Sequence, residues 1–328
     1  MQPVRLACLV ASLGIAGASC SRTPAAHRSA PDAAPSSTMN TSSPTYHDVF
    51  GPTVAGRFYP GDPTRLRSSV ASYLKEGAKQ PRRFDDSRRL VAILAPHAGY
   101  VFSGSIAGVA YAAAPKAQIK TVIVLAPSHH GRRPYACLLD ADAYRTPLGQ
   151  VGIAKDLVKR LDEAGGDLAE VDEAIFQPEH AADVQVPFVQ LAFPEARLVP
   201  IIVPSMPRPR LEALGKLLYE VVGSDPHTLV VASSDLSHFY GYDEARAIDE
   251  AIVGELERKD LATVFAKHDT RRGPCGVAPI AVTLAYLAQF GEGGEVKRLQ
   301  VLNSGDTQPD NRDRVVGYAA MAMTVPAR

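Results

Sequence analysis

Short runs of apolar residues alternate along the chain with segments in which apolar residues recur at the spacing of a helix. The apolar runs are rich in Val, Ile and Leu. They predict strands at 90–95, 121–126, 198–203, 228–232, 296–301 and 315–325. The intervening segments predict helices at 105–114, 151–164, 211–222, 243–258 and 277–290. This alternation is typical of an α/β protein.

The first four predicted strands are apolar almost throughout, rather than on every second residue. Strands of this kind favour a mainly parallel sheet that is covered by helices on both faces. We therefore expect a three-layer α/β/α sandwich, folded as a single domain over residues 47–328. The last two predicted strands, at 296–301 and 315–325, should pair antiparallel at one edge of the sheet.

The first 46 residues lack this alternation. Arg5 precedes an apolar stretch at 6–17, which is too short to cross a bilayer as a helix, and small residues then lead to Cys20. This arrangement predicts a signal peptide over 1–19, either of the lipoprotein type with Cys20 lipidated or of the ordinary secretory type. Residues 20–46 are rich in Ala, Ser, Thr and Pro, which predicts a disordered tether. We therefore expect an exported protein, anchored by lipid to a bacterial membrane and facing the periplasm or the cell surface.

Composition and charge narrow the possible functions. Hydrophobic residues make up 46% of the 328 residues and charged residues 21%, which is the profile of a globular protein. Lys and Arg together number 35, as do Asp and Glu, so the chain has no overall positive charge to attract nucleic acid. We therefore expect no nucleic-acid partner, and the candidate chemistry lies at the ends of the predicted strands.

Histidines follow three of the predicted strands. His97 follows the first strand in PHAGY, His129 follows the second in PSHHG, and His238 follows the fourth in SSDLSH. Ligands of open α/β sheets bind beyond the carboxyl ends of the strands, so these side chains should meet at one rim. Two further residues lie just before helical segments, namely His180 in EHAAD and Cys275 in GPCG.

These residue types favour a metal site. Neutral imidazole is the commonest protein ligand for metals, and a set of imidazoles with a thiolate suits zinc, iron or copper rather than calcium or magnesium. Cys275 precedes a predicted helix whose dipole would favour the thiolate, and Gly273 and Gly276 would let the backbone approach closely. Each histidine alone has a plainer explanation, as a hydrogen-bonded capping or core residue, and that explanation stays open.

Several motifs occur in one order along the chain: PHAGYVFSGSIAGVAY, VLAPSHHG, YRTPLG, EHAADVQVPF, SSDLSHF and GPCGVAPI. Together they resemble the Memo family, whose bacterial members are called AmmeMemoRadiSam system protein B. The resemblance runs from VAGRFYP to GYAA and includes none of residues 1–46. It implies a fold similar to that of LigB-type class III extradiol dioxygenases, which use non-haem iron. It also implies a site for one ion of reduced iron or copper.

The same resemblance implies roles for single residues. The implied metal ligands are His97, His129 and Cys275. The implied pocket residues, which we also consider catalytic, are His180, Asp235 and His238. Asp235 would orient a ligand histidine through its ring N–H, and His238 would act as an acid or base. The chain departs from the family pattern at Ala181, where Ser is usual, and at Phe239, where Tyr is usual, but neither change removes a ligand.

Other interpretations of the same residues remain open. His130 is either a neighbour of the metal ligands or a solvent-facing loop residue. Cys275 has two alternatives to metal binding: a disulfide with Cys137, which lies in a predicted buried strand, or a role as a nucleophile paired with a histidine. Ser233 and Ser234 are best explained as polar loop residues that cap the next helix.

Three functions therefore compete. The first is an oxygen-dependent oxidoreductase that uses iron(II) or copper(I), with zinc also chemically suitable, on an unknown small molecule. A thiolate in place of the usual carboxylate ligand shifts the preference toward copper. The second function is a non-enzymatic iron- or copper-binding protein, and the third is a cysteine-dependent hydrolase. A homodimer is also possible.

Overall fold

The computed structural model describes residues 45–269 and 272–327. Contacts divide the chain into two units, Met1–Pro44 and Thr45–Arg328, and the second contains all the described residues. The predicted signal peptide, Cys20 and nearly all of the predicted tether therefore lie outside the described residues. Among the described residues, no helix is long and apolar enough to cross a membrane.

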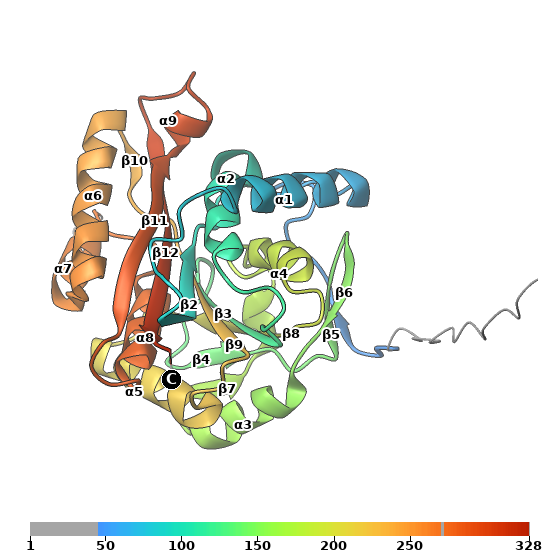
Figure 1. Ribbon diagram of the computed structural model, residues 1–328. Helices are drawn as coiled ribbons and strands as arrows, with labels where there is room; N and C mark the ends of the chain where they lie inside the picture. The colour runs from blue at the N-terminus through green and yellow to red at the C-terminus, as the bar shows by residue number, and fades with distance from the viewer. Residues whose placement is uncertain (1–44, 270–271, 328) are drawn as a thin grey trace, which may run out of the picture. The chain divides into compact units, whose positions relative to one another are not determined.

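Four parallel strands form the centre of a nine-stranded sheet (Figure 1). Their order is β2 (Arg88–Ala95), β9 (Thr228–Ser233), β3 (Thr121–Pro127) and β8 (Arg197–Val203). All four were predicted from their apolar runs, and nearly every side chain in them is buried. The sequence therefore located the parallel core of the sheet.

Antiparallel strands extend this core on both sides. Next to β2 lies β12 (Val315–Pro326), which pairs antiparallel with β2, with β11 (Glu295–Asn303) and with β10 (His238–Tyr240). On the other side, β4 (Ala136–Leu138) pairs antiparallel with β8 and parallel with β7 (Ala169–Val171). A separate three-stranded sheet contains β1 (Val49–Phe50), β5 (Ala143–Thr146) and β6 (Gly149–Gly152). The antiparallel edge predicted for 296–301 and 315–325 is confirmed.

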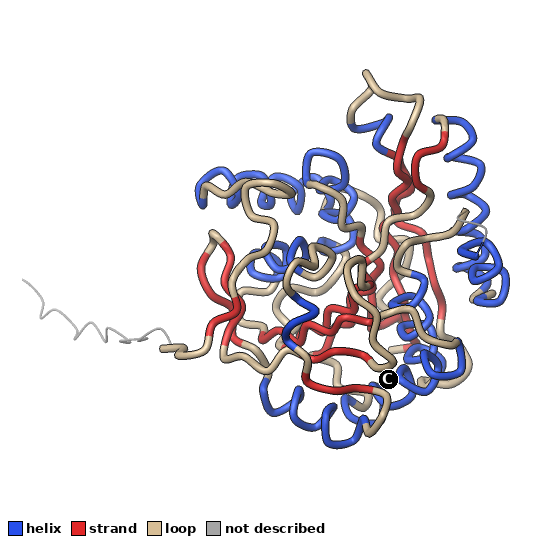
Figure 2. Tube along the Cα trace, turned by 180° about the vertical axis from the view of Figure 1, so that it is seen from behind, coloured by secondary structure: helices blue, strands red, loops and turns tan. Residues whose placement is uncertain are grey.

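Helices cover both faces of the large sheet, as Figures 1 and 2 show. One layer contains α1 (Pro63–Gly77), α2 (Tyr100–Ala112) and α4 (Val186–Ala192). The other contains α3 (Lys155–Gly165), α5 (Arg208–Val222) and α8 (Val277–Ala288). The helix α6 (Tyr242–Arg258) packs on β11 and β12, α7 (Leu261–Asp269) contacts α6 and α8, and the short α9 (Ser304–Thr307) precedes β12. The predicted three-layer α/β/α sandwich is confirmed.

Small residues allow α2 to lie between the sheet and α1. A Cβ atom on Gly108 would lie 2.4 Å from the backbone oxygen of Tyr73 in α1, and one on Gly104 would lie 2.5 Å from the Tyr73 ring. Glycine is therefore the residue that fits at both positions. This close packing on both sides explains why most of the α2 surface is apolar.

One predicted helix begins later than expected. Residues 149–152 form β6, which pairs with β5, and α3 begins only at Lys155. The reason is a tight turn at Gly149, whose φ of 115° suits glycine and folds the chain back on itself. Val151 is buried in the small sheet rather than on the apolar face of a helix.

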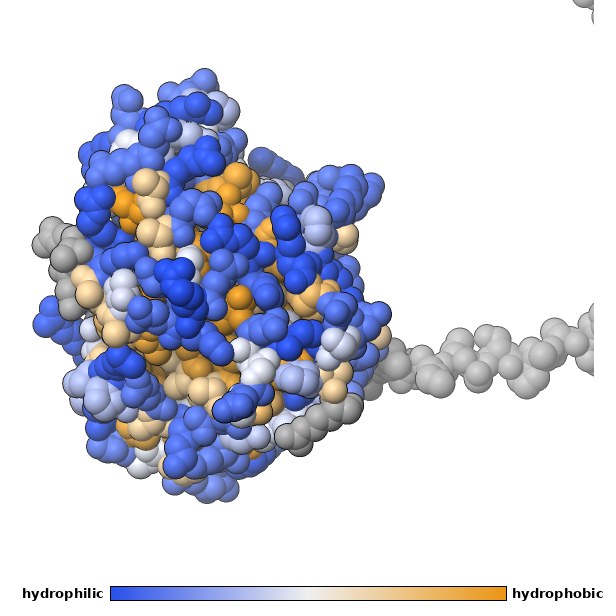
Figure 3. Space-filling view, turned by 60° about the vertical axis from the view of Figure 1, so that its left-hand side comes forward, coloured by the Kyte–Doolittle hydropathy of each residue, from blue (hydrophilic) through white to orange (hydrophobic). Residues whose placement is uncertain are grey.

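The surface outside this core is mostly hydrophilic. On the face shown in Figure 3, hydrophilic side chains predominate and apolar side chains form small patches between them. Scattered apolar side chains of this kind are normal on a globular protein. Four large hydrophobic side chains in the described part of the chain are well exposed: Val101, Phe102, Val171 and Phe239.

Candidate metal centre

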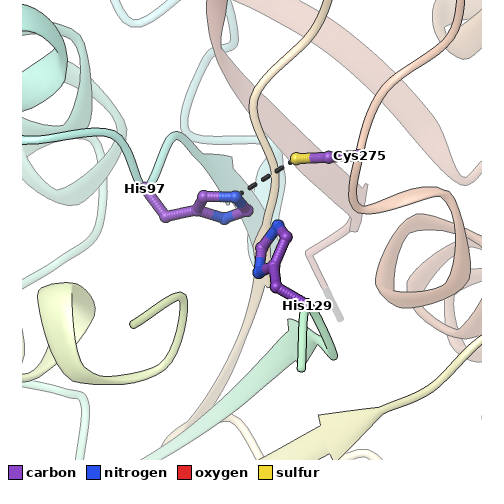
Figure 4. Close-up of side chains that lie close together, drawn as sticks. All are labelled: His97, His129 and Cys275. Atoms are coloured by element: carbon purple, nitrogen blue, oxygen red, sulfur yellow. Dashed lines mark hydrogen bonds between the residues drawn. The ribbon is translucent and has the colours of Figure 1, made fainter. Parts of the chain in front are cut away.

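Three neighbouring parallel strands carry the candidate site at their carboxyl ends. His97 lies two residues beyond β2, His129 two residues beyond β3, and Asp235 two residues beyond β9. Cys275 approaches the same rim from the loop before α8 (Figure 4). The sheet order places β9 between β2 and β3, so residues far apart in sequence meet at one place.

The side chains of His97, His129 and Cys275 point toward one another, as Figure 4 shows. Nε2 of His97 lies 3.1 Å from Sγ of Cys275, and one ligand atom from each of the three residues lies within 4.8 Å of the others. An ion bound by two imidazoles and a thiolate, at about 2.0–2.3 Å, holds its ligand atoms roughly 3–4 Å apart. The three residues can therefore hold one ion after small side-chain movements.

A chain of hydrogen bonds determines which nitrogen of His97 carries the proton. Nε2 of Gln185 donates to the carbonyl of Pro96 at 3.0 Å and to Oγ of Ser233 at 2.8 Å. Oγ of Ser233 donates to the carbonyl of Ala181 at 2.8 Å, so its one proton is used. Nδ1 of His97, 3.0 Å from the same Oγ, must therefore be the donor. This leaves Nε2 of His97 with a free lone pair that faces Cys275.

A carboxylate determines which ring nitrogen of His129 carries the proton. Nδ1 of His129 lies 2.9 Å from Oε1 of Glu179, and the His129 backbone N–H donates to Oε2 at 2.6 Å. The backbone N–H of Ala181 also donates to Oε1, at 2.8 Å. Burial alone would raise the pKa of Glu179, but His129 and these backbone donors lower it to about 2. Glu179 is thus ionised, and Nε2 of His129 is free for an ion.

His180 lies beside the two candidate ligands without replacing either. Its ring stacks on that of His129 at 4.5 Å and lies 5.4 Å from that of His97. Burial, followed by the neighbouring His97 and His129, lowers the pKa of His180 to about 3, so its ring is neutral. A second set of potential ligands, His129, Glu179 and His180, also lies close together. Because Glu179 already accepts three N–H groups, we assign it to positioning His129 rather than to binding an ion.

Asp235 occupies the position predicted for it but contacts His97 differently. Its Oδ1 accepts from the backbone N–H of His97 at 2.8 Å and from that of Ala98 at 3.3 Å. Its Oδ2 is 4.0 Å from Nε2 of His97. The expected hydrogen bond to a ligand's ring N–H is therefore wrong in detail, because Ser233 and Glu179 accept those protons. Burial raises the pKa of Asp235.

His238 presents one nitrogen for proton transfer. Its Nδ1 is 2.9 Å from the carbonyl of Leu236, which can only accept, so Nδ1 carries the proton. The free Nε2 is then the atom that can take up or deliver a proton. This geometry is compatible with the acid or base role predicted for His238.

Cys275 is held close to β9, but its thiol is not activated. Gly276 is necessary there, because a Cβ at this position would lie 2.5 Å from the backbone oxygen of Ser233. Burial, followed by the charge of Asp235, raises the pKa of the Cys275 thiol. The expected lowering by the helix dipole is therefore wrong, since burial outweighs it. A bound cation would be needed to favour the thiolate.

The remaining interpretations of the loop residues can now be compared with the structure. Cys137 and Cys275 are both free, and burial raises the pKa of Cys137 to about 12, so the disulfide alternative is not supported. His130 is exposed and belongs to neither set of potential ligands. The helix that follows Ser233 and Ser234 is α6, and no side chain caps it, so the capping role expected for the two serines is wrong. Oγ of Ser234 instead accepts from the N–H of Gly276, the residue before α8.

A cavity of about 440 Å³ is lined by His180, whose ring contacts those of His97 and His129, although none of the three candidate ligands lines it. Its lining includes His180, Asp235 and His238, the three residues predicted to be catalytic. A volume of this size is within the range of small-molecule sites.

Comparison with known proteins shows the family of this chain. The family model for "Memo-like protein" matches residues 51–322. A MEMO1 family protein from Caldivirga maquilingensis is 33% identical over 279 residues, which are 83% of this chain and 97% of that protein. The chain belongs to the Memo family. A further Memo relative, from Sulfolobus acidocaldarius, is 32% identical over 280 residues, covering 82% of this chain and 97% of its own.

A solved structure is similar to part of this Memo protein. It is an uncharacterized protein from Escherichia coli K12, 14% identical, with a TM-score of 0.49 over 72% of this chain and all of that one. The Memo family model begins at residue 51, so the first 50 residues lie outside the match.

The sequence did not reveal the residues that determine which ring nitrogen of His97 and of His129 carries the proton. Glu179 directly precedes His180 and was given no role, and Ser233 begins the SSDLSH motif but was expected only to cap the next helix. Gln185 lies in the helical segment after EHAAD and gave no signal of its own. Their roles depend on contacts between β2, β3, β9 and the segment before α4, which no spacing along the chain reveals.

Proposed function

We propose that this protein is a metal-dependent oxidoreductase that acts with oxygen on a small molecule. The observation that carries the proposal is a 440 Å³ cavity lined by His180, Asp235 and His238. His180 connects this cavity to the converging ligands, because its ring contacts those of His97 and His129. A metal store needs a reachable ion but no shaped cavity for another molecule. The combination of cavity and ligand set therefore favours an enzyme.

His97, His129 and Cys275 would hold the ion. A bound iron(II) or copper(I) ion would supply electron transfer to and from oxygen. His97 and His129 each offer a free Nε2, because Ser233 and Glu179 accept their other ring protons. Two imidazoles and one sulfur also suit zinc, so this ligand set alone favours no single metal.

The cavity residues would act on the small molecule. His238 would take or deliver a proton at Nε2, while Asp235 keeps the loop after β2 in place through the backbone of His97. His180 is neutral and walls the cavity next to the ligands. These roles need no residue that the ion already uses.

The main alternative is a cysteine-dependent hydrolase. The 3.1 Å contact between Sγ of Cys275 and Nε2 of His97 resembles a nucleophile paired with a base. Burial, however, raises the pKa of the Cys275 thiol and lowers the pKa of His97, which opposes a thiolate–imidazolium pair. The metal hypothesis is therefore preferred, because a cation supplies the charge that this thiolate needs.

The test is anaerobic purification of the full-length chain, reconstitution with iron(II), copper(I) or zinc, and metal analysis with spectroscopy. We expect one ion per chain, and at least about a hundredfold loss of affinity in His97→Ala and Cys275→Ser. The control is His130→Ala, an exposed histidine next to His129, which should bind as wild type. If wild type retains no ion, or if both ligand variants bind as well as wild type, the metal proposal is wrong.

A second measurement separates enzyme from metal binder. Oxygen uptake on a panel of small molecules should be lost in His238→Gln while metal binding is kept. An ion bound without any oxygen uptake on the panel would favour the binder. Export and lipid attachment at Cys20 concern residues outside the described part of the chain and stay sequence-based proposals.

A further inference from the structure

The mouth of the cavity carries two arginines, Arg57 and Arg314. Both are exposed, and neither forms an ion pair with any residue in the described ranges. Among the described lining residues, the only acidic one is Asp235, which is buried. Guanidinium groups without an acidic partner, next to a cavity, favour an anion and above all a planar carboxylate, which a guanidinium can bind through two hydrogen bonds.

A bulge in β10 places an aromatic ring at the same mouth. His238 pairs with Val316 and Tyr240 with Val315, so Phe239 is an extra residue in the strand. Its φ is 66°, a conformation that costs energy for any residue with a side chain, and its side chain is 59% exposed. Bulges beside a site often redirect a side chain. The ring contacts His238 and the guanidinium of Arg314 but stays largely exposed, which leaves it free to contact a ligand.

Other aromatic rings continue this apolar wall. Phe58 lies 4.6 Å from the ring of His180, and Phe102 is 40% exposed in the lining. The guanidinium of Arg314 lies 5.1 Å over the ring of Phe239, which holds the charge above the aromatic surface. The lining thus combines aromatic rings and two exposed guanidinium groups with His238, the residue proposed to transfer a proton.

We propose that this cavity binds a monoanion with a planar, apolar body. The body would lie against Phe58, Phe102 and Phe239, and the carboxylate would bind Arg57 and Arg314. This inference rests on the proposed function, since it names the substrate class of the same site. A cavity of about 440 Å³ is large enough for a bicyclic ring with a short acidic arm.

The test uses a matched pair of probes, indole-3-acetate and its neutral amide, indole-3-acetamide. The chain contains no tryptophan, so indole fluorescence comes from the probe alone. Anisotropy would be measured on the full-length chain after its metal is removed by a chelator. We expect the carboxylate to bind at least about tenfold more tightly than the amide, and added salt to reduce that difference.

Variants identify the groups responsible. Arg57→Gln combined with Arg314→Gln should remove the preference for the carboxylate while leaving weak binding of the amide. Arg67→Gln, an exposed arginine of α1 that does not line the cavity, is the matched control. Phe239→Ala should weaken both probes by a similar factor, because the ring contacts the shared indole.

Three outcomes would overturn the proposal: no binding of either probe, equal binding of both by wild type, or a carboxylate preference that survives the double variant. Because no metal is present in this assay, such a failure leaves the metal proposal standing. Conversely, a chain that binds no metal but still prefers the carboxylate would leave the anion site standing. The two proposals therefore fail independently.

Discussion

Glu179 and Asp249 are both buried carboxylates next to a histidine-bearing loop of the site, yet their acidities shift in opposite directions. Burial raises the pKa of Asp249 to about 6, and hydrogen bonding by Ser237, whose backbone N–H donates at 2.9 Å, offsets only part of that rise. Burial acts on Glu179 in the same sense, but His129 and the backbone of Ala181 lower its pKa to about 2. Donors, rather than depth, thus determine which carboxylate stays charged.

The difference separates a carboxylate that contacts a candidate metal ligand from one that contacts the backbone of a loop. Glu179 is a stable anion whose charge favours the Nδ1–H form of His129 and makes that imidazole a better ligand. Asp249, in α6, instead holds the backbone N–H of Ser237, one residue before His238. A neutral acceptor could replace Asp249, whereas none could replace Glu179. Three substitutions test this distinction.

The largest effect is expected for Glu179→Gln. An amide carries two N–H groups where Glu179 accepts three, so at least one buried donor would lose its partner. We expect the free energy of unfolding to fall by about 2–3 kcal/mol and metal affinity by about 10–100-fold. Chemical denaturation and metal titration measure the two effects. Glu292→Gln, an exposed glutamate away from the site, should change neither.

The pH dependence of the metal-free protein tests the same residue. The folded pKa of Glu179 lies below its ordinary value of 4.5, so its stabilising effect is complete above about pH 4.5 and is lost as the pH falls toward about 2. Glu179→Gln should lose this acid-dependent part of the stability. A variant whose stability fell with acid as steeply as that of wild type would show that the charge of Glu179 matters little.

Asp249→Asn should change the stability in the opposite direction from Glu179→Gln. The folded pKa of Asp249 lies above its ordinary value of 3.8, so the folded state binds its proton more tightly and stability is lost as the pH rises from about 4 to about 6. The amide oxygen can still accept from Ser237. We expect the variant to be more stable than wild type at pH 7 by up to about 3 kcal/mol, and equally stable at pH 4.

Denaturation curves at several pH values measure this effect. Asp86→Asn, whose side chain is fully exposed, is the matched control and should show no such dependence. If Asp249→Asn were destabilising at pH 7, Asp249 would need its charge as Glu179 does, and the distinction between the two carboxylates would fail.

Much of the fold was predictable, because burial leaves a clear pattern. The four central strands are apolar almost throughout, and each was located to within two residues at either end. The short strands β4, β7 and β10 were not proposed as elements, since three residues are too few to show a period. The turn at Gly149 was also missed, so Val151 was assigned to a helix rather than to β6.

The candidate metal ligands were predictable from the sequence, but the residues that hydrogen-bond to them were not. His97, His129 and Cys275 lie in motifs that resemble the Memo family, and the structure brings all three together. The proton positions depend on Glu179 and Ser233, which reach the ligands only after β2, β3 and β9 pair. The pKa of Cys275 was predicted in the wrong direction, because a sequence shows a helix terminus but not the depth of burial.

The smallest of the three effects is expected for Ser233→Ala. This variant tests whether a neutral acceptor positions the His97 ring as well as the charged Glu179 positions that of His129. The change leaves the His97 ring N–H and one Gln185 N–H without their acceptor. We expect a loss of about 1–2 kcal/mol in stability and about tenfold in metal affinity, less than for Glu179→Gln because no charge is lost. Thr283→Val removes another buried hydroxyl, which donates to Pro279 in α8, and should leave metal affinity unchanged. Equal losses of affinity in Ser233→Ala and Glu179→Gln would mean that orientation, rather than charge, is what both supports provide.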